Sequence, residues 1–186
     1  QIITYDASGD PVAVGPGTSG QILTSAGAGA PPTFAASGSV NDVKFLACLT
    51  SRSTNGTGAG AGYSTVGKTF TEIYDIGSNF SNGTFTAPET GKYILFGTFF
   101  FINTATANNQ TIIYFATSNR GYNALRSHGY NLYPYQGNLL FSVVADMDAS
   151  DTFHMTVNMY GGSQTVHIDG NATPQNGTFM GAALIA

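Results

Sequence analysis

The run of aromatic and aliphatic residues from Tyr93 to Ile102 constrains this chain more than any other feature. Its composition and length predict a β-strand. Side chains alternate between the two faces of a strand, and here both faces are apolar, whereas a strand with one wet face would carry polar residues on it. We therefore expect one face to line a core and the other to be covered as well, by a subunit interface. The residues expected in these two roles are Tyr93, Leu95, Phe96, Phe99, Phe100 and Phe101.

The rest of the chain predicts an all-β fold. No long segment shows the 3.6-residue apolar period of an amphipathic helix. Short β-rich runs are separated instead by clusters of Gly, Asn and Pro, which is typical of a sandwich or barrel. Ser51 to Lys68 is expected to be a glycine-rich loop. The expected strands are Asp42–Thr50, Phe70–Ile76, Thr111–Thr117, Leu139–Val144 and Thr152–Tyr160.

Charge is scarce in this chain. Asp, Glu, Lys and Arg make up 9% of the residues, against roughly 25% in typical soluble proteins, and the formal net charge is −4. With six Lys and Arg residues in total, a surface that follows nucleic-acid phosphates is not expected. No apolar run reaches the roughly 18 to 20 residues of a membrane span, so no membrane insertion is expected. No secretory signal segment is evident after Gln1, and the single cysteine, Cys48, is expected to be a buried thiol.

Residues Gln1 to Val40 differ from the rest in being rich in Gly, Ala, Ser and Pro. Within them, GPGTSGQILTSAGAGAPPTF, Gly15 to Phe34, resembles a motif of phage and other viral tail-fibre proteins, where such a stretch precedes a trimeric knob. Gln21 to Thr24 is expected to form a short strand between glycine turns. One copy of this segment cannot bury enough surface to fold alone, but three copies wound together can. A flexible linker is the alternative.

The remainder of the chain resembles another family. Phe70, Phe80 and Gly83-Thr84-Phe85, followed by Gly91-x-Tyr93 and the aromatic strand, are similar to the globular head of complement component one-q, which shares its jelly roll with tumour necrosis factor. The family's upstream aromatic stands here at Phe80, and Ser150 replaces the usual Gly before Asp151.

Three later stretches carry the same resemblance. They are Leu139–Val144 before Met147-x-x-x-Asp151, the alternating Thr152–Tyr160, and the closing Phe179-x-Gly181-x-x-Leu184-Ile185. The similarity spans about residues 42–186. It implies a jelly-roll β-sandwich that assembles as a homotrimer.

The segment Arg120 to Gln136 is crowded with tyrosine and is the candidate binding surface. Tyrosine offers a flat apolar face and a hydrogen-bonding tip, which suits contacts with sugars and proteins. The alternative is that some of these rings pack in the sandwich or between subunits. The candidate ligand-binding residues are Arg120, Tyr122, Arg126, Tyr130, Asn131, Tyr133 and Tyr135.

No catalytic motif is evident. The histidines are scattered, and neither His-Glu-x-x-His nor Gly-x-Ser-x-Gly occurs, so an enzyme is not expected. Asp146, Asp148 and Asp151 could bind calcium through carboxylate oxygens, although they lack the Gly and distal Glu of an EF-hand loop. A solvated acidic turn is the alternative. No other cofactor is expected.

These observations predict a homotrimeric jelly-roll knob, residues 41–186, preceded by a short fibre-like collar, residues 1–40. The expected role is structural and adhesive. The knob would form the tip of a viral or phage fibre, bind a host-surface glycan or protein receptor, and join a larger virion or fibre assembly through its N-terminus. It is expected at the virion surface or outside the cell. The alternatives are a bacterial surface or appendage-tip adhesin and a secreted, complement-like pattern-recognition lectin.

Overall fold

The computed structural model describes residues 2–36, 43–57, 62–104, 109–128, 136–161, 166–175 and 177–185. The chain divides into two compact units, Gln1–Val40 and Asn41–Ala186. No helix within the described ranges is long and apolar enough to cross a bilayer.

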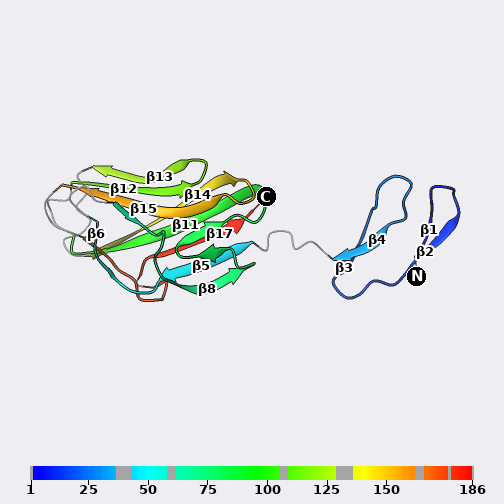
Figure 1. The fold of residues 1–186 in the computed structure, drawn as a ribbon, viewed down its shortest axis with the longest axis horizontal. Helices are drawn as coiled ribbons and strands as arrows, with labels where there is room; N and C mark the ends of the chain where they lie inside the picture. The colour runs from blue at the N-terminus through cyan, green and yellow to red at the C-terminus, as the bar shows by residue number, and fades with distance from the viewer. Residues whose placement is uncertain are drawn as a thin grey trace. The chain divides into compact units, whose positions relative to one another are not determined.

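Regular structure in the described residues consists of β-strands, as Figure 1 shows. The first unit holds β1 (Ile2–Tyr5), β2 (Pro11–Val14), β3 (Gln21–Thr24) and β4 (Thr33–Ala36). The second unit holds β5 (Lys44–Leu49), β6 (Ser53–Thr57), β7 (Gly62–Ser64), β8 (Phe70–Ile76), β9 (Phe80–Ser81), β10 (Thr84–Thr86), β11 (Gly91–Ile102), β12 (Gln110–Thr117), β13 (Gly121–His128), β14 (Gln136–Met147), β15 (Thr152–Tyr160), β16 (Val166–Ile168) and β17 (Phe179–Leu184).

The first unit is a pair of antiparallel hairpins, β1 with β2 and β3 with β4. The predicted strand Gln21 to Thr24 is β3 and is confirmed. Apolar side chains on both hairpins remain largely exposed: Ile3 is 69% exposed, Tyr5 65% and Ile22 53%. A segment of this size buries little apolar surface of its own, so these hairpins need further contacts for stability.

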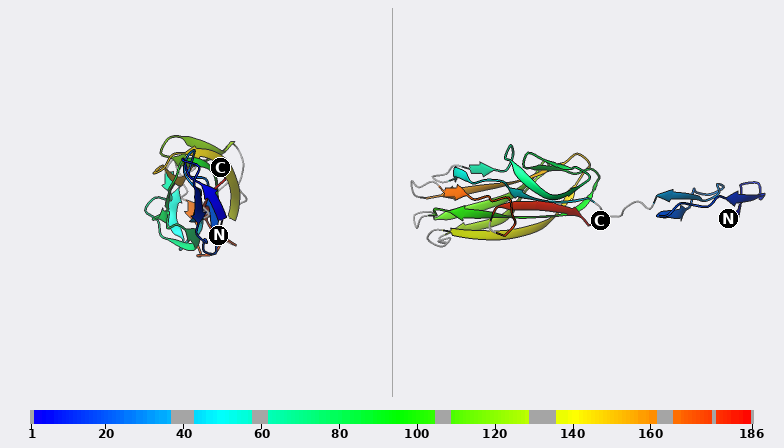
Figure 2. Two further views of the ribbon diagram at one scale, coloured as in Figure 1. Left: turned by 90° about the vertical axis from the view of Figure 1, so that its right-hand side faces the viewer. Right: turned by 90° about the horizontal axis from the view of Figure 1, so that it is seen from below.

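The second unit is a sandwich of two antiparallel sheets, seen from two further directions in Figure 2. One, the β11 sheet, runs β6-β16-β11-β17-β5-β8, with β14 also paired to β11. The other, the β15 sheet, runs β13-β12-β15-β10-β9, with β7 also paired to β15. The predicted all-β sandwich is therefore confirmed.

The core lies between the two sheets and follows the predicted alternation. Phe153, Met155, Val157 and Met159 of β15 are at most 1% exposed, and the residues between them are half-buried. Tyr93, Leu95, Phe99 and Phe101 of β11 face them and are completely buried. Phe45 stacks on Phe80 and Phe85 with ring centroids 4.6 and 5.0 Å away. Cys48 is buried as predicted, and burial raises the pKa of its thiol.

Gly97 is the one glycine within the apolar run of β11, and side-chain packing explains why a glycine stands there. A Cβ atom at this position would overlap the sulfur of Met155 and would lie 2.8 Å from the carbonyl oxygen of Phe179. The glycine therefore lets a large side chain of the facing sheet fill the core at this point.

The segment Ser51 to Lys68 differs from its prediction as a loop, because it contains β6 and β7. β6 pairs with β16, and β7 pairs with the middle of β15. Tyr63 of β7 is a core residue at 4% exposure, and the buried hydroxyl of Thr65 donates to the carbonyl of Gly83 over 2.9 Å. These partners are distant in sequence, so the local glycine content does not reveal them.

The two ends of the sandwich differ. At one end, which we call the entry end, the backbone of Leu184 donates to Val43 and that of Ile185 donates to Lys92. At the other, the distal end, Ile102 pairs with His167 and Gln136. Gln110 also lies there, opposite His128 and Tyr160. The strands that flank the connections 58–61, 105–108, 129–135 and 162–165 thus meet at the distal end.

Candidate functional site

The side of the β11 sheet that points away from the core is unusually apolar. We call it the outward face. Leu140 and Val144 of β14 are 68% and 53% exposed, and Tyr74 and Ile76 of β8 are 42% and 41% exposed. The two strands lie at opposite edges of the sheet, so exposed apolar groups stand at both edges of this face. Exposed apolar residues gathered on one face of a sheet favour an interaction surface.

Half-buried apolar residues connect these two edges. The strand register sets Val144 and Ala183 on either side of Ile94, and Ser142 and Gly181 on either side of Phe96. Phe100 lies further along the same face of β11. The residues predicted for core and interface are thus divided. Tyr93, Leu95, Phe99 and Phe101 lie in the core, while Phe96 and Phe100 are half-buried on the outward face. The interface itself stays a prediction.

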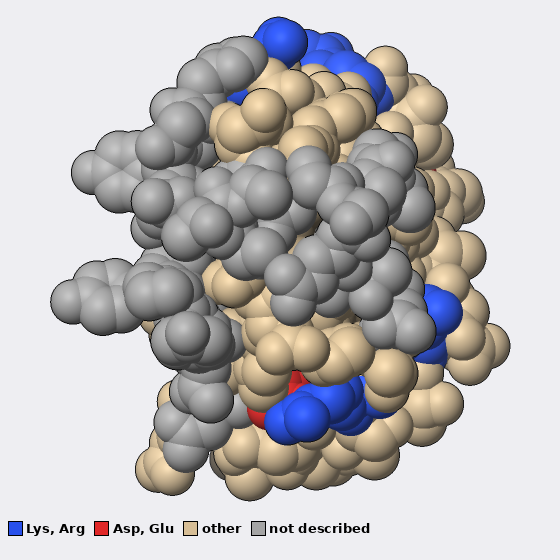
Figure 3. Space-filling model, turned by 90° about the vertical axis from the view of Figure 1, so that its left-hand side faces the viewer, with Lys and Arg blue, Asp and Glu red and all other residues tan. Residues whose placement is uncertain are grey.

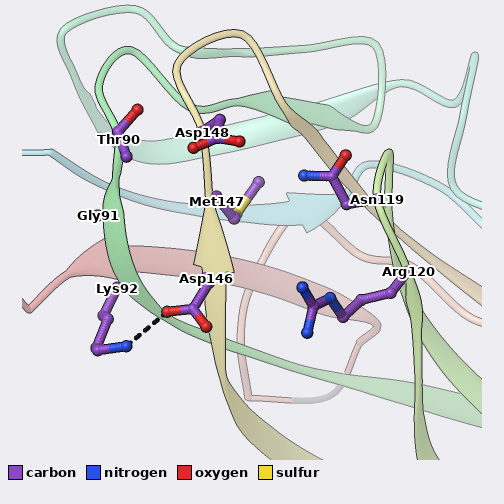
Figure 4. Close-up of a pocket in the computed structure, with 8 residues that line it drawn as sticks. All are labelled: Thr90, Gly91, Lys92, Asn119, Arg120, Asp146, Met147 and Asp148. Carbon is purple, nitrogen blue, oxygen red and sulfur yellow. Dashed lines mark hydrogen bonds and ion pairs between the residues drawn. The ribbon is translucent and has the colours of Figure 1, made fainter.

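A polar pocket of about 400 Å³ opens at the entry end, and Figure 4 shows its residues. We call it the Arg120 pocket. Lys92 and Asp146, opposite one another on β11 and β14, form an ion pair with 2.6 Å between Nζ and Oδ1. The guanidinium of Arg120 extends toward the same carboxylate. The hydrogen bond and charge of Lys92, with a smaller effect of Arg120, lower the pKa of Asp146. The lining residues are Thr90, Gly91, Lys92, Asn119, Arg120, Asp146, Met147 and Asp148.

Asp151, one of the three candidate calcium ligands, ties two turns together. Its carboxylate accepts hydrogen bonds from the hydroxyl of Ser118 over 2.6 Å and from the backbone nitrogen of Asp148 over 2.8 Å. The side-chain amide of Asn119 also donates to it. The Ser118 hydrogen bond, followed by that from Asp148, lowers the pKa of Asp151. This carboxylate therefore links the turn at Ser118 and Asn119 to the turn at Asp148 through hydrogen bonds.

Asp146 and Asp148 line the Arg120 pocket, but their surroundings differ from a cation site. Asp146 is paired with Lys92, and Arg120 faces it. Among the residues that the structure describes, no group of three or more His, Cys, Asp and Glu side chains is arranged to hold a metal ion. Calcium binding at Asp146, Asp148 and Asp151 stays a prediction.

The candidate ligand-binding residues do not form one group in the structure. Arg120 lines the pocket at the entry end, and Arg126 is exposed further along β13. Tyr122 is half-buried and packs against the core. Tyr130, Asn131, Tyr133 and Tyr135 lie outside the described residues, and their binding role stays a prediction.

The described residues on either side of 129–135 lie at the distal end. His128 is the last residue of β13, and Gln136 is the first residue of β14. Figure 3 shows this end of the molecule, where most of the described atoms belong to residues without charge.

Sequence reasoning missed the Arg120 pocket as a unit. Lys92 and Asp146 are far apart in the chain and meet only through the register of β11 and β14. The acidic turn can be recognised in the sequence, but the sequence does not reveal that Lys92 and Arg120 lie opposite it.

Comparisons with known proteins support the fold. No protein-family model matches the chain, and no curated protein matches it. The globular domain of the zebrafish complement 1qA protein is similar in structure, with 11% identity and a TM-score of 0.51 over 78% of this chain and 98% of that chain. A crystal structure of murine APRIL at pH 8.0 shows 10% identity and a TM-score of 0.51 over 76% of this chain and 98% of that chain.

At these identities, the likeness concerns the fold alone. The chain has a complement-type and TNF-type jelly roll, as predicted. The predicted resemblance of Gly15 to Phe34 to tail-fibre proteins stays a prediction.

Proposed function

We propose that this chain is a homotrimeric adhesive knob at the tip of a viral or phage fibre. Residues 41–186 form the jelly-roll head, and residues 1–40 form the collar that joins it to a larger assembly. The head lies at the virion surface or outside the cell. It binds a glycan or protein receptor on the host surface.

The outward face of the β11 sheet is the observation that carries this proposal. Leu140 and Val144 at one edge and Tyr74 and Ile76 at the other are exposed and apolar, and covering them with further copies of the same chain removes them from water. Heads of this fold typically assemble as trimers, which supports three copies. A ring of three uses two different patches of each head and closes on itself, so no further copies add to it.

The layout of the head supports a role at a tip. The chain enters and leaves at one end through Val43 and Ile185, so an attached fibre would continue from there. The distal end is then presented outward. Connections between strands, rather than the strands themselves, commonly carry binding residues on such scaffolds. Three copies of a weak site on one trimer multiply the single-site affinity through avidity.

Light scattering on the full chain tests the assembly. Three chains of 19.3 kDa correspond to about 58 kDa. A stable monomer at micromolar concentration would contradict the trimer, because the outward face would then stay exposed.

A glycan array combined with attachment to host cells tests the adhesive role. The trimer should bind a defined set of uncharged or weakly charged glycans or a cell-surface protein, since the chain offers six Lys and Arg residues in total for pairing with sulfate or phosphate. If the trimer bound neither glycans nor any cell surface, the receptor role would be contradicted, and the knob would have a structural role alone.

A further inference from the structure

Two turns of the second unit, residues 50–53 and 65–69, enclose a small pocket beside β7. The backbone nitrogen of Thr50 donates to the carbonyl of Thr69 over 3.1 Å, and the hydroxyls of Thr50 and Thr71 lie 3.1 Å apart. These contacts hold the two turns at a fixed spacing. The pocket has a volume of about 210 Å³. Sites for drug-sized ligands span roughly 300 to 1,000 Å³, so this pocket suits a smaller chemical group.

Tyr63 of β7 lines this pocket, and its hydroxyl is buried. The residue is 4% exposed, and its ring packs edge-on against Phe99 with 6.0 Å between the centroids. Burial raises the pKa of Tyr63 to about 12, and the nearby hydroxyl of Ser53 offsets a smaller part of that rise. By distance and angle, the Tyr63 hydroxyl has no hydrogen-bond partner among the residues that the structure describes. A buried donor without an acceptor is rare and calls for an explanation.

Two cationic residues line the pocket together with Tyr63. The side chain of Arg52 donates from Nε to Asp169 over 2.7 Å, and a guanidinium carries two further nitrogens that can donate. Lys68 lies with its ammonium 5.3 Å from the centroid of the Tyr63 ring. Within the described ranges, no carboxylate forms an ion pair with Lys68. Ser51 and Thr69 also line the pocket.

We propose that this pocket binds a small oxyanion group, a carboxylate or a phosphate, with Arg52 and Lys68 pairing its charge and Tyr63 donating to one of its oxygens. Arginine, lysine and a protonated tyrosine all donate hydrogen bonds, and an oxyanion supplies only acceptors. A tyrosine hydroxyl, with an ordinary pKa of about 10, is protonated at neutral pH, and burial raises the pKa of Tyr63 further. The group is either free or carried by an acidic sugar. This inference does not rest on the proposed trimer or on the adhesive role.

Isothermal titration calorimetry on the full chain, in Tris-chloride buffer at pH 7.5, tests the proposal with three probes: inorganic phosphate, glucuronate and glucose. Glucuronate and glucose share the sugar ring and differ in the carboxylate. We expect phosphate, glucuronate or both to bind. Tighter binding of phosphate would indicate a free oxyanion, and tighter binding of glucuronate would indicate an acidic sugar. Failure of both anions, or equal binding of glucose, would overturn the proposal.

Three variants locate the binding. Tyr63→Phe removes only a hydroxyl that has no protein partner, so the fold does not lose a hydrogen bond. It should weaken anion binding about fivefold, and Lys68→Gln should weaken it about tenfold, as expected for losing one hydrogen bond and one charge-assisted hydrogen bond. Lys92→Gln changes a lysine in the Arg120 pocket and should leave the affinity unchanged. Unchanged affinity in both Tyr63→Phe and Lys68→Gln, or equal loss in Lys92→Gln, places the anion elsewhere and refutes the site.

Discussion

The ring of Phe96 lies directly over Gly181 on the outward face of the β11 sheet. The two residues are opposite one another in the β11–β17 pair. A Cβ atom at Gly181 would overlap the edge of the Phe96 ring and would lie 2.7 Å from the carbonyl oxygen of Phe45. The glycine thus lets an aromatic ring lie flat across the neighbouring strand, and the ring covers backbone that would otherwise face water.

Gly181→Ala should therefore destabilise the protein. The ring of Phe96 can rotate away, but the backbone carbonyl of Phe45 cannot move without disturbing β5. We expect a loss of about 1 to 3 kcal/mol in the free energy of unfolding, as is usual for overpacked sites, and a lower Tm in thermal denaturation. Gly121→Ala is the matched control, since a Cβ atom there meets nothing within 4 Å. Equal stability of the two variants would contradict the packing role of Gly181.

Leu140→Glu should weaken the proposed trimer. Leu140 is 68% exposed on the outward face, so the substitution should change the free energy of unfolding of the isolated head little. In the proposed trimer, it places a carboxylate in an apolar contact between copies. Light scattering over a dilution series should show dissociation at a protein concentration at which the wild type stays trimeric. Asn123→Glu adds the same charge to an exposed position of the β15 sheet and should not alter assembly. A Leu140→Glu trimer as stable as the wild type would place the interface on another surface.

Ser118→Ala should raise the pKa of Asp151. In the folded protein, hydrogen bonds from Ser118 and Asp148 hold this pKa below its ordinary value of 3.8. Because the folded-state pKa is depressed, the ionised carboxylate stabilises the fold fully above pH 3.8, and this contribution is lost as the pH falls through the lower folded value. In Ser118→Ala, this contribution should be smaller, and its loss should be complete at a higher pH than in the wild type.

Carboxyl-carbon NMR measures this change directly. The Asp151 signal should titrate at higher pH in Ser118→Ala than in the wild type. Ser142→Ala, at an exposed position of β14, should leave the Asp151 titration unchanged. Identical titration of Asp151 in the wild type and in both variants would show that Ser118 does not lower the pKa of Asp151.

Tyr130→Ala, Tyr133→Ala and Tyr135→Ala test the binding surface predicted from the sequence. Each should leave the trimer intact and weaken attachment to the target cell, with a lost aromatic contact costing on the order of 1 to 2 kcal/mol. Tyr5→Ala, an exposed tyrosine of the first unit, is the control for attachment. Variants that dissociate or unfold, while the surviving trimers attach normally, would show that these tyrosines are structural.

Deletion of residues 1–40 tests the collar. The boundary of the two compact units falls at Val40, so the shortened chain should fold as a head. The trimer should then melt at a lower temperature, because the contacts among the apolar side chains of Ile3, Tyr5 and Ile22 are lost. An unchanged melting temperature would favour the linker alternative for this segment.

The alternation of apolar residues made the sandwich predictable. Phe153, Met155, Val157 and Met159 face the core as their spacing indicates, because period-two burial leaves a direct trace in the sequence. β7 leaves no such trace. It is three residues long, and Tyr63 becomes a core residue only because β15 supplies its hydrogen-bonding partners.

The candidate site was less predictable for a similar reason. Lys92 and Asp146 are paired by strand register, and an acidic turn in the sequence does not disclose a lysine on another strand. Tyr122 looked like part of a binding surface, but alternation along β13 turns its ring toward the core. Residue type indicates what a side chain can bind, whereas orientation decides whether it can reach a ligand.

The separation of the entry and distal ends makes the head a natural display scaffold. β13 ends at His128 and β14 begins at Gln136, and the long pairing of β14 with β11 fixes the start of β14 independently of what connects the two strands. A foreign peptide grafted between them would be carried at the end opposite to Val43 and Ile185. A fusion partner attached after Ile185 would then not obstruct it, and an epitope or enzyme tag could be exchanged there without redesigning the core.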